Sequence, residues 1–206
     1  GTEIPVERVR RALREATVGG RIFPVLCGSS LRNKGIQPLL DAVVDYLPSP
    51  ADVREISAIR PNTGEFVSIR PGRAEPLAAL VFKIMSDAYV GKLAFLRVYS
   101  GALRPGKTVL NASSGTRDRV HTLVRMHANE RERIDVVEAG DIAAAAGLKA
   151  VSTGDTLCEE SHPLILESMV FPEPVVAIAI EPKTRADAAI LEQALAKLLA
   201  EDPTFR

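Results

Sequence analysis

Alternation of apolar and polar residues marks the middle of the chain as a β-rich segment. From residue 77 to residue 157, apolar runs of strand length are separated by glycine-containing turns. Between residues 119 and 127, apolar and threonine side chains alternate with mostly basic ones, which predicts a single strand with one apolar and one largely basic face. Residues 93–99 are apolar at nearly every position, which predicts a strand covered on both faces. Several short strands at this spacing favour a closed β-barrel or sandwich.

The segments on either side of this block have the pattern of α/β domains. Residues 1–17 and 36–47 carry apolar positions at helical spacing, and between them 22–27 is a short apolar run typical of a buried strand. Residues 175–180 predict another strand, and Thr184 with Asp187 predicts the capping box of a helix whose apolar face spans 190–199. Each flank is too short to bury its own apolar face, so we expect both to be parts of neighbouring domains.

Residues 48–76 are rich in proline and have weak periodicity. This composition predicts an interdomain linker, with a short hairpin around residues 62–64 (NTG).

Composition narrows the possible functions. Lysines and arginines number 26, as do aspartates and glutamates, so any attraction to nucleic acid must come from a local patch. No apolar run is long enough to cross a membrane, and no signal-peptide pattern opens the chain. The two cysteines are typical of reduced thiols in a cytosolic protein, and the three histidines lack the spacing of metal ligands.

Residues 101–108 (GALRPGKT) fit the phosphate-loop pattern G-x-x-x-x-G-K-[ST]. A phosphate loop requires a helix that opens at the lysine, with its N-terminus facing the phosphates. The residues after Lys107 are β-branched and then turn-like, and Pro105-Gly106 favours a type II turn. We therefore expect a β-hairpin here. A nucleotide hydrolase remains the alternative, and a helix starting at Lys107 would favour it.

Basic side chains concentrate on and around the strand 119–127. They are Arg117, Arg119, Arg125, Arg131 and Arg133, with Lys92, Arg104 and Lys107 on neighbouring turns. Such a group suits nucleic-acid phosphates, and the lack of interleaved aromatic residues argues against base stacking. Acidic residues interrupt the run, so the residues alone leave open that these are solvated outward positions of a barrel.

Several short motifs occur along the chain, and they are read together and in order. They are residues 27–30 (CGSS), 33–37 (NKGIQ), 40–43 (LDAV), 45–50 (DYLPSP), 90–93 (VGKL), 97–101 (RVYSG), 126–131 (MHANER), 139–144 (AGDIAA), 147–149 (GLK), 153–158 (TGDTLC), 171–175 (FPEPV) and 181–184 (EPKT). In this order and spacing they closely resemble bacterial elongation factor G, the translocation GTPase of the ribosome. The resemblance implies a mixed α and β fold, mainly β. Residues 1–47 would be the end of the GTP-binding domain, 48–76 a linker, 77–168 the β-barrel second domain, and 169–206 the start of a ferredoxin-like third domain.

The resemblance also implies site residues. Gly28, Ser29 and Ser30 match the family segment that helps to hold the guanine base, with Ser30 in place of the usual alanine. The family's phosphate loop, switch regions and N-K-x-D motif lie upstream, so we expect no catalytic residue, no metal, no bound cofactor and no GTP hydrolysis in this chain. The intact factor would bind GTP with Mg²⁺.

The family's second domain contacts small-subunit ribosomal RNA, and this favours the nucleic-acid interpretation of the basic patch. The expected RNA-binding residues are Arg125, His127, Asn129, Arg131 and Arg133. The expected partners are the ribosome and the other domains of the same factor, for a chain that is monomeric and cytoplasmic. A ribosome-protection protein or a paralogous elongation factor G is the alternative within the same family of GTPases.

Overall fold

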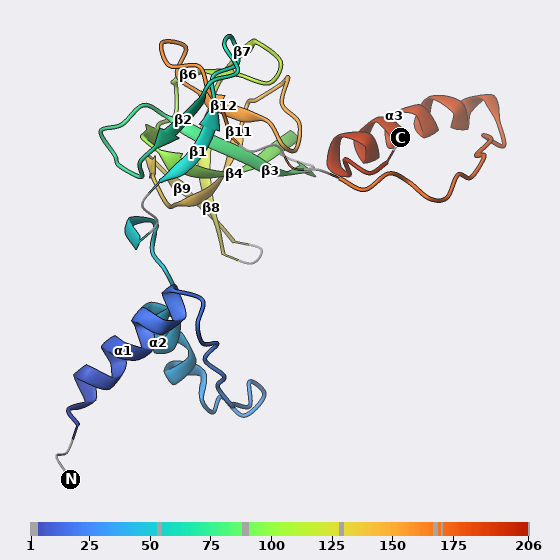
Figure 1. Cartoon of the computed structure of the whole chain (residues 1–206). Coiled ribbons are helices and arrows are strands. Elements are labelled where there is room, and N and C mark those ends of the chain that lie inside the picture. The colour runs from blue at the N-terminus through green and yellow to red at the C-terminus, as the bar shows by residue number, and fades with distance from the viewer. Residues whose placement is uncertain are drawn as a thin grey trace. The chain divides into compact units, whose positions relative to one another are not determined.

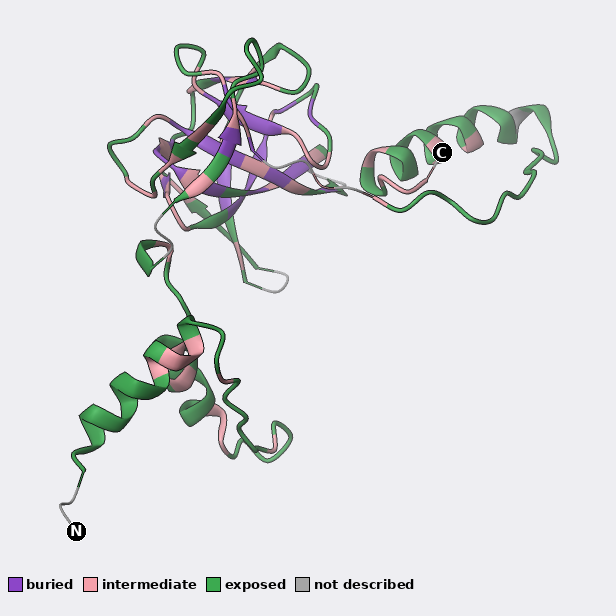
Figure 2. Ribbon diagram, in the orientation of Figure 1, coloured by how far each residue is buried: buried purple, intermediate pink, exposed green. Residues whose placement is uncertain are grey.

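The computed structural model describes residues 4–52, 55–87, 91–127, 130–166, 169 and 171–205. The chain divides into two compact units, Gly1–Arg54 and Glu55–Arg206. Figure 1 shows helices in the first unit, and a barrel of strands followed by one helix in the second. Among the described residues, the buried ones all lie in the second unit, where Figure 2 shows them gathered in the strands.

The first unit contains α1 (Val6–Val18), α2 (Ile36–Tyr46) and a short 3-10 helix, η1 (Pro50–Asp52). The predicted C-terminal end of the first helix and both ends of the second are confirmed to within one residue, whereas the first helix begins at Val6 and not at residue 1. Pro5 precedes α1, and Gly35, at φ 77°, precedes α2. Helix α2 ends at Tyr46, since the following Leu47 is extended, as expected for a residue before proline.

Arg14 on α1 binds the C-terminal end of α2. Its guanidinium donates to the carbonyl oxygens of Asp45 at 2.9 Å and Leu47 at 3.2 Å, and pairs with Asp52 Oδ2 at 2.6 Å. A cation at this position satisfies carbonyl groups that the helix leaves unpaired. The Ser49 N–H and hydroxyl donate to the same Asp52 carboxylate; these bonds, with a smaller contribution from Arg14, hold its pKa below the usual value.

The two flanking segments predicted as strands, 22–27 and 175–180, are not paired in the structure. Their side chains are open to solvent: Val25 is 88% exposed and Val175 is 95% exposed. A β-strand is defined by hydrogen bonds to a neighbouring strand, and within the described residues neither segment has one. The apolar run is therefore present in each case without the ladder that would make it a strand.

An antiparallel sheet in the second unit curves around one apolar core. Its strand order is β7-β6-β12-β3-β4-β11-β8-β9, and a separate short pair, β5–β10, adds Leu103 and Val137 to the same core. The strands are β3 (Ala78–Asp87), β4 (Gly91–Ser100), β5 (Ala102–Leu103), β6 (Thr108–Asn111), β7 (Thr116–Arg119), β8 (Thr122–His127), β9 (Glu130–Ile134), β10 (Val137–Glu138), β11 (Ile142–Ala146) and β12 (Thr156–Cys158). This confirms the predicted barrel-centred fold.

Strands β4 and β11 are covered on both faces, as the sequence predicts. Leu96 on β4 and Ala145 on β11 face the barrel core, while Leu93 and Ala144 belong to a second apolar cluster on the other face. Ala144 is fully buried on that face, so the alanine run of β11 fits where larger residues would collide.

The region predicted as one strand from 119 to 127 is broken into β7 and β8 at Val120 and His121. Val120 and Leu123 both reach the core, although a continuous strand would place them on opposite faces. The break sets His121 against Gly147, whose φ is +96° and where an added Cβ would lie 2.6 Å from the imidazole Cγ. The predicted basic face is therefore interrupted by a core residue, Leu123.

A three-stranded sheet with the order β13-β1-β2 packs on the outside of the barrel. It consists of β1 (Ile56–Ile59), β2 (Phe66–Ile69) and β13 (Ile165–Leu166). The hairpin expected near residues 62–64 is present, with Gly64 at φ 69°. The expected linker of 48–76 differs from the structure, because strands from within it bury Ala58 against Ala78 and Cys158.

Helix α3 (Arg185–Glu201) opens with the predicted capping box between Thr184 and Asp187. Near its end, the Glu201 carboxylate accepts a hydrogen bond of 2.7 Å from the backbone N–H of Ser86 on β3. The bonds from Ser86 are the main cause of a lowered pKa at Glu201. Ile190 and Leu198, on the predicted apolar face of the helix, are 66% and 47% exposed.

Candidate nucleic-acid interface

Four of the five residues predicted to bind RNA lie on the β8–β9 hairpin: Arg125, His127, Arg131 and Arg133. The fifth, Asn129, lies outside the described residues. Direct cross-strand neighbours share a face of an antiparallel pair, and Arg125 lies opposite Glu132 while Val124 lies opposite Arg133. The register therefore brings the four residues onto one hairpin but divides them between its two faces.

Glu132 lies between the two basic side chains of the first face. Its Oε2 is 3.8 Å from Arg125 Nη1 and 3.6 Å from His127 Nε2. All three side chains are between 44% and 63% exposed, so water screens both contacts. Pairs of this kind contribute about 0–1 kcal/mol. The carboxylate thus holds both side chains loosely.

Arg131 and Arg133 lie on the other face, beside the apolar side chains of Val124 and Met126. Arg131 forms a short ion pair with Asp87 at the end of β3, and the Asp87 side chain is only 13% exposed. Among the described residues, Arg133 has no ion pair or side-chain hydrogen bond. The structure thus distinguishes a tethered arginine from an untethered one on the same strand.

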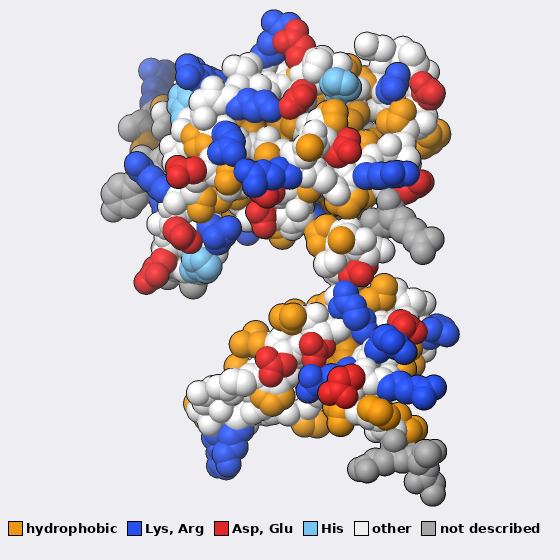
Figure 3. Space-filling model, turned by 90° about the vertical axis from the view of Figure 1, so that its left-hand side faces the viewer, with side chains coloured by type: hydrophobic (Ala, Val, Ile, Leu, Met, Phe, Trp, Pro, Cys, Tyr) orange, Lys and Arg blue, Asp and Glu red, His pale blue; other side chains and the backbone are white. Residues whose placement is uncertain are grey.

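The other basic residues of the predicted patch are mostly engaged elsewhere in the barrel. Arg117 pairs with Glu160, Lys107 pairs with Glu159 at 2.6 Å, and the Arg119 side chain donates to the carbonyl of Gly106 at 3.0 Å. The arginines of β7 and those of β9 also lie on strands at opposite ends of the sheet order, and not on neighbouring strands. Figure 3 shows basic and acidic side chains intermixed over one face of the barrel. The predicted patch is therefore not one continuous basic surface.

Lys92 is turned away from any such surface. Its Nζ donates a hydrogen bond to the carbonyl of Val151, and burial lowers the pKa of its ammonium despite the charges of Asp155 and Asp118. The ammonium group is therefore bonded to the loop before β12.

The segment 101–108 does not form a phosphate loop. Arg104 O accepts from Lys107 N–H at 3.3 Å across a turn with Gly106 at φ +84°, as in a type II turn. The Gly106 N–H donates to Val120 O at 2.7 Å, so this backbone donor is used inside the barrel. Strand β6, not a helix, begins at Thr108. The predicted turn is confirmed, but the predicted β-hairpin is wrong, because the flanking strands β5 and β6 pair with other strands and not with each other.

Gly28, Ser29 and Ser30 begin a tight loop in the first unit. Ser29 exchanges two backbone hydrogen bonds with Lys34, at 2.9 and 3.0 Å, and Ser30 O accepts from Asn33 N–H at 3.0 Å. A Cβ at Gly28 would lie 2.9 Å from Lys34 O, so only glycine allows the two arms of the loop to approach so closely. The structure brings the three residues together in a preorganised loop whose Ser29 backbone is already paired.

Sequence reasoning missed the acidic partners of the basic residues, above all Asp87 and Glu132. The signal for Glu132 was available, since a hairpin that pairs His127 with Glu130 also places Glu132 opposite Arg125. The contact between Arg131 and Asp87 joins residues 44 positions apart and had no local signal.

Two family models match the chain. The model described as elongation factor G domain 2 matches residues 76–160, and the model described as elongation factor G domain III matches residues 171–206. Together the two matches cover more than half of the chain. The chain belongs to the elongation factor G family. A crystal structure of a protein from Thermus thermophilus is similar over 99% of this chain, with 30% sequence identity and a TM-score of 0.74.

The elongation factor G domains identified here are part of a translational GTPase family. The chain spans 28% of the length of the Thermus protein that it matches. The barrel corresponds to domain 2, and α3 lies within the domain III match. The barrel's match to this family, rather than the charge of its surface, identifies the chain as part of a translation factor.

GTP with Mg²⁺ is the ligand that the elongation factor G family implies. Phosphates in such sites are held by convergent backbone N–H groups at a helix N-terminus. In the part of the chain that the structure describes, the only segment with a phosphate-loop pattern is 101–108. It forms a turn followed by the start of β6, and its Lys107 pairs with Glu159. These residues do not fit a phosphate and Mg²⁺ site.

Metal-ligand clusters and membrane-spanning helices are both absent from the described residues. No group of three or more His, Cys, Asp or Glu side chains in them could hold a metal ion. None of the helices described has the length and apolar character needed to cross a bilayer.

Proposed function

We propose that this chain is the part of a ribosomal translocation factor that docks on small-subunit ribosomal RNA through the β8–β9 hairpin. The contacts would come from Arg125, His127, Asn129, Arg131 and Arg133. The observation that carries the proposal is the loose pairing of the basic side chains with Glu132, at 3.6 and 3.8 Å and in solvent. An RNA phosphate could replace such a carboxylate at little cost, because the exposed pair is weak.

The distribution of the arginines favours recognition of a backbone over recognition of bases. The described part of the hairpin carries no Phe, Tyr or Trp side chain on which a base could stack. Within the described residues Arg133 has no side-chain partner that it would have to lose before it binds a phosphate. Because its basic side chains lie on both faces, the hairpin could contact phosphates on either side. Such contacts orient a protein on RNA without distinguishing the base sequence.

We further propose that the barrel couples the GTPase domain of the intact factor to domain III. Support comes from two neighbouring residues at the end of β3. The Ser86 N–H is bonded to Glu201 of α3, and the Asp87 carboxylate is paired with Arg131 of the hairpin. A displacement of α3 would therefore act on the strand end that also holds Arg131. In this proposal the chain itself does not hydrolyse GTP, and it works in the cytoplasm with the ribosome.

The test is binding of the intact factor to ribosomes over a salt series. The double variant Arg125→Glu and Arg133→Glu should bind at least about tenfold more weakly, with a log–log salt slope reduced by about one for each lost phosphate contact. Arg104→Glu is the matched control, because Arg104 is an exposed arginine on the turn before β6. Equal affinities and slopes for the double variant and the unmodified factor would contradict the proposal.

A further inference from the structure

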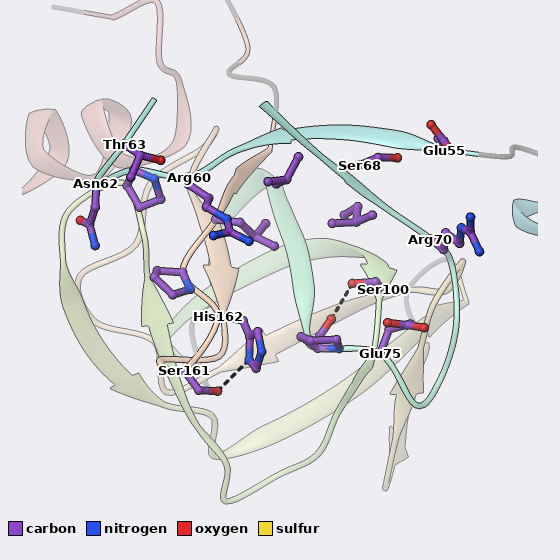
Figure 4. Close-up of a pocket in the computed structure, with 16 residues that line it drawn as sticks. Glu55, Arg60, Asn62, Thr63, Ser68, Arg70, Glu75, Ser100, Ser161 and His162 are labelled. Carbon is purple, nitrogen blue, oxygen red and sulfur yellow. Dashed lines mark hydrogen bonds between the residues drawn. The ribbon is translucent and has the colours of Figure 1, made fainter. Parts of the chain in front are cut away.

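A pocket of about 670 Å³ lies between the β1–β2 hairpin and the outside of the barrel. The hairpin forms one wall, and residues 75–76 and the loop 161–164 form the other side. Figure 4 shows Arg60, Ser161 and His162 at one end, and Ser100, Glu75 and Arg70 at the other. The pocket lies entirely in the second unit, away from the β8–β9 hairpin.

Strand β2 runs along this pocket with a free edge. In the described chain it pairs with β1 only, and the sheet ends there. The Arg60 N–H donates to Glu65 O at 2.9 Å, so Arg60 and Glu65 are a hydrogen-bonded pair of the antiparallel ladder. Along β2, every second residue from Glu65 therefore directs its backbone groups toward β1. By that alternation the backbone groups of Val67 and Ile69 face β1, while those of Phe66 and Ser68 face outward. Four backbone donors and acceptors therefore line an open edge.

The side chains around this edge suit an extended partner. Val67, Ile69 and Leu164 present an apolar surface inside the pocket. On the outer face of the same strand, Phe66 is 75% exposed. An added strand alternates its side chains between two faces, so it would cover the pocket with one set and Phe66 with the other. An exposed edge of this kind attracts strand pairing unless something blocks it.

Charge at the two ends of the pocket is uneven. Glu55 and Glu75 both lie near Arg70, whereas the end at Arg60 and His162 has no carboxylate among the lining residues that the structure describes. Arg60 is only loosely paired, at 4.0 Å from Glu65, with both side chains more than half exposed. This end therefore favours a negatively charged group.

We propose that the free edge of β2 is a docking site for an extended acidic peptide segment of a partner protein. The segment adds as a fourth strand beside Phe66–Ile69, and one of its Asp or Glu side chains binds Arg60. Strand addition supplies main-chain hydrogen bonds, and the pocket and Arg60 supply selectivity. The site is separate from the proposed RNA contact and would serve a protein partner.

The test uses the whole 206-residue chain and fluorescein-labelled heptapeptides of alternating Val and Thr that carry Glu-Asp at either end. The peptide whose acidic pair lies at the end that reaches Arg60 should bind, as measured by fluorescence polarisation. The same peptide with lysines in place of the acidic pair should not bind. Arg60→Gln should weaken binding about tenfold, since hydrogen bonds to charged groups are among the stronger ones. Glu65→Gln, the matched change on the partner of Arg60, should strengthen binding or leave it unchanged.

The edge itself is tested at Ser68. Ser68→Pro removes the outward N–H and should abolish binding, while Ser68→Thr keeps the N–H and should bind normally. Should Ser68→Pro unfold the hairpin, amide exchange on the unmodified chain decides, because the peptide should protect the Phe66 and Ser68 amides. Absence of acidic-peptide binding at millimolar concentration, equal binding of the lysine peptide, or binding without protection of these amides would overturn the proposal.

Discussion

Glu132 lies directly opposite Arg125 in the β8–β9 ladder, and its carboxylate is 3.8 Å from the Arg125 guanidinium. The same oxygen is 3.6 Å from His127, so one acid restrains two of the residues proposed to contact RNA. Glu132 would then be a competitor of the RNA phosphates.

Glu132→Gln should therefore strengthen ribosome binding by the intact factor. Loss of the competing carboxylate frees Arg125 and His127, and we expect a few-fold gain in affinity at low salt that shrinks as salt rises. Glu160→Gln is the control, because it releases Arg117 on β7 instead. Weaker binding by Glu132→Gln in a sedimentation assay would mean that Glu132 positions the arginines rather than competing for them.

The barrel core should carry most of the stability of the second unit. Leu96 is fully buried, and Leu96→Ala should lower the free energy of unfolding by about 2–5 kcal/mol through lost burial and the cavity left behind. Ile142 on β11 is 54% exposed, so Ile142→Ala should cost much less, about 0.5 kcal/mol or below. Urea unfolding followed by circular dichroism measures both, and similar losses for the two variants would contradict this assignment of the core.

The two cysteines should differ in reactivity and in their effect on stability. Cys158 is buried, and burial raises the pKa of its thiol, whereas Cys27 is exposed. Thiolate is the reactive form, so a thiol reagent at pH 8 should label Cys27 rapidly and Cys158 only on unfolding. Mass spectrometry of the labelled peptides checks this, and prompt labelling of Cys158 in the folded chain would disprove it.

The sign of the pH dependence follows from the raised pKa of Cys158. The folded chain favours the protonated thiol, so its contribution to stability is complete below the ordinary thiol pKa, about 8.5, and is lost as pH rises through the higher folded value. A Cys158→Ala variant should lack this alkaline loss. Identical pH profiles above pH 8.5 for the variant and the unmodified chain would count against it.

Nucleotide binding is expected to be absent at the segment 101–108. Its backbone is a turn, and Lys107 is paired with Glu159. Titration calorimetry with GTP should give no micromolar binding for the unmodified chain or for Lys107→Ala. Micromolar binding that disappears in Lys107→Ala would restore the phosphate-loop interpretation.

The sequence predicts the elements whose signal is local. The apolar run of β4, the helical spacing of α2 and the capping box of α3 each depend on neighbours within a few residues, and each is found where expected. The turn at Pro105 and Gly106 is predicted for the same reason, since proline and glycine limit the backbone directly.

Features that depend on distant partners are not predicted in this way. The segment 22–27 has the composition of a strand, but pairing requires a neighbour that composition cannot supply. The break at Val120 and His121 arises because Val120 and Leu123 both pack into one core, which alternation alone does not show. The basic residues were identified from their type, whereas their ion pairs depend on strand register and on contacts such as Arg131 with Asp87.

The close packing of Gly147 against His121 affects the strand that carries Arg125 and His127. No side chain fits at position 147 without displacing the imidazole, and the His121 N–H is bonded to Ala146 O at 2.9 Å. That bond lies next to the Thr122–Ala146 pair at the start of the β8–β11 ladder, so a displaced His121 would disturb the strand that carries Arg125 and His127. A side chain at position 147 should therefore displace the β8–β9 hairpin. Such a substitution should weaken ribosome binding as the loss of an arginine would, although it contacts none of the arginines.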